Sequence, residues 1–279
     1  LFLVGWRVEF GHRISRMMDR PTSPVTTPEI EETFGDGPPA ALRAAPAPTM
    51  TAEWGRLRAF LRRPTLDVSA QNASPLKVIA RIYALDMVVM FALILAASVA
   101  VALGVYIPET ALAGIEFTPL IVAGVVIGAP VFEELIFRSW LSGKPQHILA
   151  LFGLLAGVLG FGLIHRSGTI LGVAVLAAGI GAAALALFLL RRTPPMRWFS
   201  AIFPAAFWLA TMAFALVHLL NFDEGALYVL LPLVLPQFVL GTLVGYLRVR
   251  IGLWAAIVLH AAHNATALSL AALATLFQS

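Results

Sequence analysis

Three groups of polar residues stand inside apolar stretches of this sequence, and together they hold the side chains that hydrolysis of a peptide bond requires. In chain order they are Glu133, Glu134 and Arg138, then His218, then His260 and Asn264. A carboxylate and an imidazole can take a proton from water. A second imidazole and an amide can donate hydrogen bonds to a developing oxyanion. The residue types therefore indicate a hydrolytic site.

The first group follows an apolar run that begins near Phe117. A charge at the centre of a membrane helix costs about 2.5–3.5 kcal/mol, so these groups should face a protein interior or a wet cavity. Glu134 and Arg138 are four residues apart and can neutralise each other on one helix face. Glu133 points about 100° away and has no partner nearby in sequence, which suits a proton acceptor. The alternative is a structural ion-pair cluster that only holds helices together. We favour a functional role, because ionisable residues inside membrane helices are functional by default.

The two later groups lie on helical faces. Phe214 and His218 are four residues apart, as are His260 and Asn264, so each pair shares one face. His263 lies about 60° from His260 around the same helix. The same atoms permit a second interpretation, a zinc ion held by Glu133, His218 and His260 with one position open for water.

Several other chemistries are excluded. The chain has no cysteine, which excludes a thiol nucleophile, disulfides and thiolate metal ligands. It has no His-Glu-x-x-His helix, so a zincin-type site is excluded, and it has no Gly-x-Ser-x-Gly element or Gly-rich phosphate loop.

The composition predicts an all-α, polytopic membrane protein. Of the 279 residues, 59% are hydrophobic and 12% are charged. Seven apolar runs, within a range of six to eight, are long enough to span a bilayer. They are 82–105, 117–138, 148–165, 169–190, 199–220, 226–247 and 251–275. The third and fourth are rich in Gly and Ala, which suits close helix packing but also fits a re-entrant hairpin.

Basic residues gather in alternate loops between these runs, with Arg166 as the one exception. The positive-inside rule then predicts a cytoplasmic N-terminus and an external C-terminus. The net charge of +4 thus reflects topology, and we expect no nucleic-acid partner. We expect a multi-pass protein of a bacterial plasma membrane, with Asp86 near the cytoplasmic end of the first span reaching interfacial water.

The chain ahead of the spans differs in composition. Residues 20–75 are rich in Pro, Ala and Thr and have no sustained apolar period, and residues 1–20 are too broken by charge for a span. These features predict a flexible, mostly disordered cytoplasmic tail at 1–75 before a membrane domain at 76–279. Within the tail, Trp54 to Arg63 is typical of a short basic amphipathic helix on the membrane surface. A solvated linker helix fits the same residues equally well.

The three motifs, Glu133-Glu134-x-x-x-Arg138, Phe214-x-x-x-His218 and His260-x-x-x-Asn264, resemble those of the CPBP family of CAAX proteases and bacteriocin-processing (Abi) enzymes. This family is related to the eukaryotic type II CAAX prenyl endopeptidase. The resemblance covers about residues 80–275. It implies an all-helical intramembrane protease with a cavity opening towards the cytoplasm.

The resemblance also implies roles for the six residues. Glu133 and His218 would activate water, His260 and Asn264 would stabilise the oxyanion, and Glu134 and Arg138 would orient the site. Both a metalloprotease and a metal-free glutamate mechanism are held for this family, so zinc stays open as a cofactor.

Two features depart from the family pattern. Residues 147–195 insert two extra spans between the first two motifs. In addition, the predicted spans place Glu133 in the cytoplasmic half of the membrane and His218 near the external end. The two side chains can meet only if helices are tilted or broken, or if the span boundaries are shifted.

The sequence therefore predicts an intramembrane endopeptidase acting on a membrane-associated protein or peptide, of which a prenylated CAAX protein is one example. One alternative is a proton-coupled transporter with a relay through Glu133, His218 and His260. Another is an inactive scaffold or immunity factor that binds a peptide in the cavity.

Overall fold

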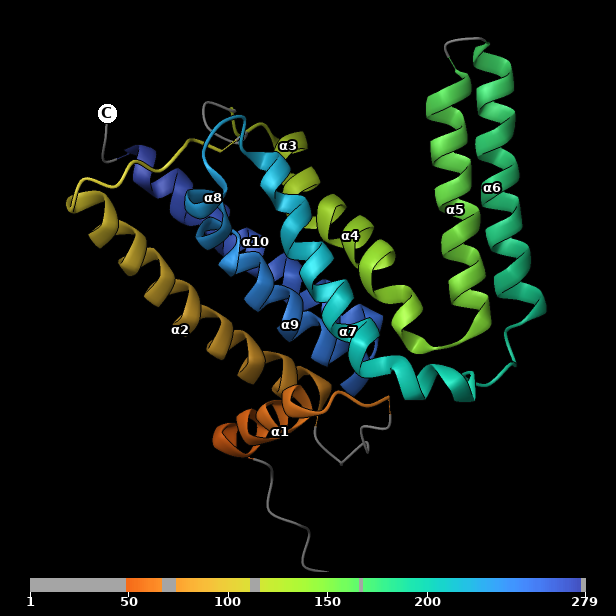
Figure 1. Cartoon of the computed structure of the whole chain (residues 1–279), viewed down its shortest axis with the longest axis horizontal. Helices are drawn as coiled ribbons and strands as arrows, with labels where there is room; N and C mark the ends of the chain where they lie inside the picture. The colour runs from red at the N-terminus through yellow and green to blue at the C-terminus, as the bar shows by residue number, and fades with distance from the viewer. Residues whose placement is uncertain (1–48, 67–73, 111–115, 166–167, 277–279) are drawn as a thin grey trace, which may run out of the picture. The chain divides into compact units, whose positions relative to one another are not determined.

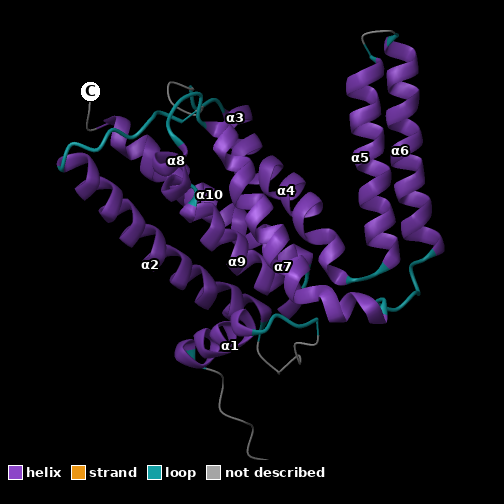
Figure 2. Cartoon of the chain, viewed as in Figure 1, coloured by secondary structure: helices purple, strands orange, loops and turns teal. Residues whose placement is uncertain are grey.

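A computed structural model describes residues 49–66, 74–110, 116–165 and 168–276. Every regular element among these residues is a helix (Figure 2), which confirms the all-α prediction. The elements are α1 (Met50–Arg62), α2 (Pro75–Ala102), α3 (Pro119–Ala123), η2 (Gly124–Gly128), α4 (Ala129–Arg138), η3 (Ser139–Ser142), α5 (Pro145–Ile164), α6 (Thr169–Leu189), α7 (Arg197–Val217), η4 (His218–Asn221), α8 (Leu227–Leu233), α9 (Leu235–Arg250) and α10 (Leu253–Leu276). Most of the predicted tail, residues 1–48, and Arg166 lie outside the described residues.

Seven helical stretches in the described chain are long and apolar enough to cross a membrane, as predicted. They are Pro75–Ala102, Pro119–Ser142, Pro145–Ile164, Thr169–Leu189, Arg197–Asn221, Leu227–Arg250 and Leu253–Leu273. The first begins seven residues before the predicted start at 82, because Pro75 suits the first turn of a helix.

Helix α9 lies at the centre of the helices that carry the polar motifs. It contacts α2, α7 and α10, and α10 in turn contacts α4 and α2 (Figure 1). Two glycines of α9 let side chains of the neighbouring helices α7 and α4 approach it closely. A Cβ on Gly245 would stand 2.7 Å from the Phe207 ring, and one on Gly241 would stand 2.9 Å from Nη2 of Arg138. Small residues of this kind permit the tight packing on which membrane helix bundles depend.

Helices α5 and α6 form a hairpin whose two arms pack along each other (Figure 1). Glycine makes this possible, since a Cβ on Gly179 would lie only 2.6 Å from both the Gly153 carbonyl oxygen and the Gly157 Cα. The arms have 20 and 21 residues, so each is about 30 Å long, which matches the hydrocarbon core of a bilayer. Two full spans therefore fit these residues better than a re-entrant hairpin.

Helix α7 changes direction near its start, where Figure 1 shows its first turns running across the end of the neighbouring helices. Pro204 lies inside this helix. Proline has no N–H for the helical hydrogen bond and its ring crowds the preceding turn, which bends a helix. Helix α7 contacts α4, and His218, which follows the last residue of α7, lies near Glu133.

Within the range predicted as tail, residues 50–62 form α1, and one face of it is buried. Glu53, Leu57 and Phe60 are the buried residues of this helix. The Glu53 carboxylate accepts a 2.7 Å hydrogen bond from the hydroxyl of Tyr246 on α9 and pairs with Arg56 at 2.8 Å. The described chain thus includes α1 as part of the helical unit rather than as a free linker helix.

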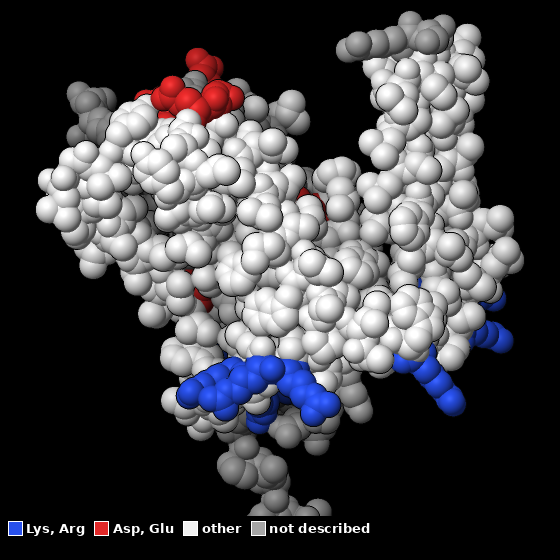
Figure 3. Space-filling model, viewed as in Figure 1, with Lys and Arg blue, Asp and Glu red and all other residues white. Residues whose placement is uncertain are grey.

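Charged residues separate to opposite ends of the helices. Figure 3 shows Lys and Arg gathered at the end where α1 lies and Asp and Glu gathered at the other. The exposed acids include Asp223 and Glu224 between η4 and α8. Glu224 accepts a 2.7 Å hydrogen bond from Tyr106, and this bond raises the pKa of the Tyr106 hydroxyl.

Candidate active site

The helix that carries Glu133 contains a local defect ahead of it. In η2 the N–H of Ala129 bonds to the carbonyl of Gly124, five residues back rather than four. The next carbonyl, that of Val125, would need the N–H of residue 130 to continue this pattern, but residue 130 is proline and has none. The Val125 carbonyl instead accepts a 2.9 Å hydrogen bond from Nδ2 of Asn264 on α10. Single π-turns of this kind recur at functional sites.

Glu133 on α4 faces two histidines from two other elements. Its Oε2 lies 3.9 Å from Nε2 of His218, at the end of α7, and 3.7 Å from Nε2 of His260 on α10. Both separations are too long for a direct hydrogen bond and are suited to a bridging water. The Glu133 side chain is 25% exposed, whereas that of His260 is 3% exposed. Oε2 of Glu133 has no hydrogen-bond partner among the described residues.

The hydrogen bond made by Nδ1 of each imidazole shows which ring nitrogen carries the proton. Nδ1 of His218 lies 2.7 Å from the carbonyl oxygen of Phe214, and a carbonyl can only accept, so Nδ1 carries the proton. Nδ1 of His260 lies 2.9 Å from Oε1 of Glu134 and donates to that carboxylate in the same way. Whenever one of these rings carries a single proton, its lone pair is then on Nε2, the nitrogen nearer Glu133.

Glu134 and Arg138 form the predicted pair, with Nη1 of Arg138 at 3.3 Å from Oε1 of Glu134. Both side chains are buried, at 0% and 1% exposure. The guanidinium also lies 3.9 Å from the ring centre of Phe214, a cation–π contact that gains strength away from water. The same oxygen, Oε1 of Glu134, is paired with Arg138 and hydrogen-bonded to Nδ1 of His260, so the pair helps to fix the position of the His260 ring.

Arg248 of α9 is a residue that sequence reasoning missed. Its guanidinium donates to the carbonyl of Arg138 at 3.0 Å and to that of Ser139 at 3.1 Å, so it holds the last turn of α4. In the sequence it stands among basic residues that set topology. No local signal identifies it, because its partners are backbone atoms more than a hundred positions away.

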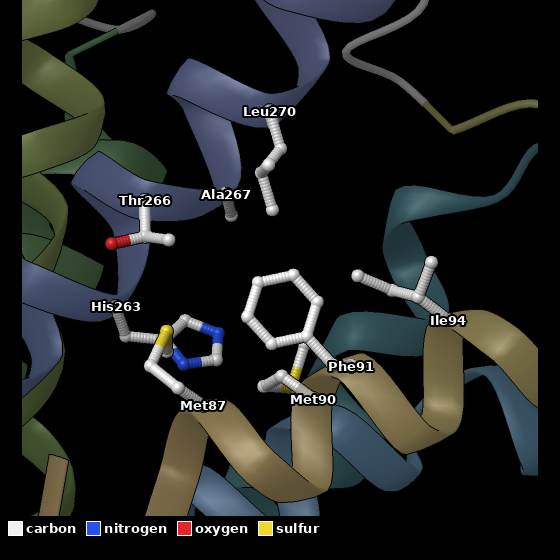
Figure 4. A pocket seen from close by; sticks show the side chains of 8 residues that line it. All are labelled: Met87, Met90, Phe91, Ile94, His263, Thr266, Ala267 and Leu270. Carbon is white, nitrogen blue, oxygen red and sulfur yellow. The ribbon is translucent and has the colours of Figure 1, made fainter. Parts of the chain in front are cut away.

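His263 and Asp86 form a second buried polar pair, with Nδ1 of His263 at 2.8 Å from Oδ2 of Asp86. The expectation that Asp86 reaches interfacial water is wrong, because Asp86 is 0% exposed. The Asp86 carboxylate is hydrogen-bonded by the His263 imidazole of α10 instead of by interfacial water. Figure 4 shows His263 beside Met87 and Phe91 of α2, at a small pocket of about 30 Å³.

The structure brings Glu133, His218 and His260 together, but their arrangement does not match a zinc site. In a tetrahedral site with bonds of about 2.0–2.1 Å, neighbouring ligand atoms stand about 3.3 Å apart. The separations of 3.7 and 3.9 Å are wider. Among the residues that the structure describes, no three His, Asp or Glu side chains are disposed to hold a metal ion.

Comparison with known proteins gives one match. A family model described as type II CAAX prenyl endopeptidase Rce1-like matches residues 114–196 and 187–266, which together span more than half of the chain. These two segments contain all six candidate residues. Neither the curated proteins nor the solved structures gave a match.

Proposed function

Because the chain belongs to the Rce1-like family of type II CAAX prenyl endopeptidases, we propose that it is an endopeptidase that cleaves a peptide bond in a membrane-associated protein or peptide. The observation that carries this proposal is the position of Glu133 Oε2 within 4 Å of two imidazole Nε2 atoms. The six motif residues supply a base, hydrogen-bond donors and an orienting ion pair, which are the parts that peptide hydrolysis needs.

In the proposed reaction a water molecule lies between Glu133 and the two imidazoles. Glu133 takes a proton as the water oxygen attacks the scissile carbonyl, assisted by the Nε2 lone pair of His218. The proton then passes to the leaving amine as the carbon–nitrogen bond breaks, and one new carboxyl and one new amine result. No step requires a metal ion, in keeping with the wide separations between the three side chains.

The oxyanion is assigned to His260 and Asn264. His260 can donate to the oxyanion only when Nε2 carries a proton, while the Glu134 carboxylate accepts from its Nδ1. One N–H of the Asn264 amide donates to the Val125 carbonyl, and in the proposed reaction the second N–H donates to the substrate. Glu134 and Arg138 act as positioning residues, since Glu134 contacts His260 and Arg138 pairs with Glu134.

The orientation in the membrane follows from the charged ends. Lys and Arg gather at the end where α1 lies, and Asp and Glu gather at the other end (Figure 3). By the positive-inside rule the α1 end faces the cytoplasm, so substrates would be recognised from that side. A lipidated or otherwise membrane-anchored cytoplasmic peptide is the substrate class that fits.

The decisive experiment compares the wild type with Glu133→Gln, both purified and reconstituted in lipid nanodiscs. Each is incubated with a set of membrane-anchored peptides, with and without a prenyl group, and products are identified by mass spectrometry. Glu109→Gln is the matched control, because Glu109 is an exposed carboxylate outside the helices. Cleavage by the wild type and the control but not by Glu133→Gln supports the proposal.

Two other outcomes would overturn it. If the Glu133→Gln variant still cleaves the peptides, Glu133 is not the general base. Absence of cleavage by the wild type, together with pH-driven uptake into vesicles, would point to a transporter. Metal analysis of the same preparations, before and after chelation, tests the metal-free assignment: loss of cleavage that returns only on adding zinc would contradict it.

A further inference from the structure

A groove runs between α1, α2 and α7, away from the proposed active site, with a volume of about 370 Å³. Its apolar walls include Trp54 and Leu61 of α1, Leu85 of α2 and Trp208 of α7. At α1 its lining also includes two arginines, Arg58 and Arg62. The groove therefore combines an apolar floor with positive charge on one wall.

The walls of the groove are fixed by hydrogen bonds. The indole N–H of Trp54 donates to the carbonyl of Arg81 on α2 at 3.0 Å. The buried Glu53 of α1 accepts from Tyr246 of α9 at 2.7 Å. Helix α1 is thus held to both α2 and α9, and the groove does not depend on a loosely attached helix.

The two arginines are four residues apart and so lie on one face of α1. Both are exposed, and neither has an ion-pair partner among the residues that the structure describes. The acid of the same helix, Glu53, is buried and already paired with Arg56. The positive charge of Arg58 and Arg62 is therefore available to an anionic group.

The groove also reaches from the basic residues of α1 to the side of an apolar helix. Leu85 lies within the stretch Pro75–Ala102 that is long and apolar enough to cross a membrane, and it stands four residues, about 6 Å, after Arg81. An occupant with its charge at Arg58 and Arg62 would therefore place its apolar part against Leu85 and Trp208. Such an occupant must be an anionic amphiphile.

We propose that this groove binds an anionic phospholipid of the leaflet at the basic end of the helices. The phosphate contacts Arg58 and Arg62, and one acyl chain lies against Leu61, Leu85 and Trp208. Charge complementarity selects an anionic over a zwitterionic headgroup, and the apolar walls select a lipid over a free phosphate. The site is independent of peptide cleavage.

Lipid binding can be measured by native mass spectrometry of the full chain in detergent. Phosphatidylglycerol and phosphatidylcholine with the same acyl chains are compared, with glycerol phosphate as the headgroup alone. We expect phosphatidylglycerol to bind on the order of tenfold more tightly than phosphatidylcholine, with the difference shrinking at high salt. Glycerol phosphate should not bind measurably.

The test variant is Arg58→Gln/Arg62→Gln, which should lower phosphatidylglycerol binding to the level of phosphatidylcholine. Arg191→Gln/Arg192→Gln is the matched control, because it removes the same charge from exposed positions after α6 and should retain the preference. Thermal unfolding shows whether each variant is folded. The proposal fails if both double variants lose binding equally, if the two lipids bind alike, or if glycerol phosphate binds as well as the lipid.

Discussion

Glu133 and Glu134 are consecutive residues of α4, yet their carboxylates lie near opposite nitrogens of one imidazole. Glu133 Oε2 lies 3.7 Å from Nε2 of His260, and Glu134 Oε1 lies 2.9 Å from Nδ1. Adjacent helical residues point about 100° apart, so one ring can be held from one side and left open on the other. This arrangement is the one that the proposed roles require, with Glu134 as the positioning acid and Glu133 as the reactive one.

We expect Glu133→Gln to reduce cleavage at least a hundredfold while leaving thermal stability close to that of the wild type. A general base contributes about 10²–10⁴-fold to a rate. Glu133 is a quarter exposed and has no direct hydrogen bond at Oε2, so its amide should be tolerated. Rates are measured with an anchored peptide and unfolding by differential scanning fluorimetry. A large fall in melting temperature would instead make Glu133 structural.

Glu134→Ala should do the reverse and destabilise the fold strongly. Its removal leaves the buried Arg138 guanidinium without its carboxylate, which costs about 3–5 kcal/mol. The double variant Glu134→Gln/Arg138→Gln removes both charges. Its loss of stability should be smaller than the sum of the losses measured for Glu134→Gln and Arg138→Gln separately. Additive losses in this cycle, followed by thermal unfolding, would show that the two side chains do not interact.

Asn264→Ala should lower the stability of the protein, because it leaves one carbonyl of η2 without a hydrogen bond. The Val125 carbonyl would lose its donor, which costs about 1–3 kcal/mol for a buried acceptor. Pro130→Ala restores a backbone N–H at the position where the π pattern needs one, so it should recover part of the stability in the Asn264→Ala background. If Pro130→Ala lowers stability equally in both backgrounds, the proline is not the reason for the free carbonyl.

Asp86→Leu should lower stability by about 1–3 kcal/mol, because it leaves His263 buried without a hydrogen-bond acceptor. Asp86→Asn should cost less, since the amide oxygen can still accept from Nδ1 of His263. The comparison is made by thermal unfolding in detergent. Equal losses for the two variants would mean that volume at residue 86, and not the hydrogen bond, stabilises the contact.

Gly179→Val should separate α5 from α6, because even a Cβ there would lie 2.6 Å from backbone atoms of the other arm. Gly181→Val is the control, since a Cβ at Gly181 meets nothing within 4 Å. Protease sensitivity of the connection between α5 and α6 reports the effect. Similar sensitivity in both variants would show that the close approach is not needed for the hairpin.

The periodicity and length of the apolar runs were enough to predict the helices. A segment that crosses a bilayer must satisfy its backbone internally and must be apolar for about 20 residues, so each of the seven spans is visible locally. The same reasoning finds the pair Glu134 and Arg138, because residues four apart meet on any helix. The largest boundary shift, seven residues, lies where Pro75 begins α2.

The depth of His218 could not be read from the spans. Straight helices with the predicted boundaries place it far from Glu133, whereas in the structure its Nε2 lies 3.9 Å from Oε2 of Glu133. Helix α7, which contains Pro204, changes direction near its start (Figure 1), and the span of Glu133 ends at Ser142 rather than at 138. A proline inside an apolar run predicts a kink, but not the direction in which the helix then runs. That direction depends on which neighbours the helix packs against.

The sequence alone determined the class of protein and the helices and indicated the six candidate residues, because each of these depends on composition or on spacing within one helix. Only the tertiary structure decided which groups meet: His260 with both glutamates, Asn264 with Val125, and Asp86 with His263. Each of these contacts joins separate helices. Their partners are chosen by how helices pack and turn about their axes, which no single segment encodes.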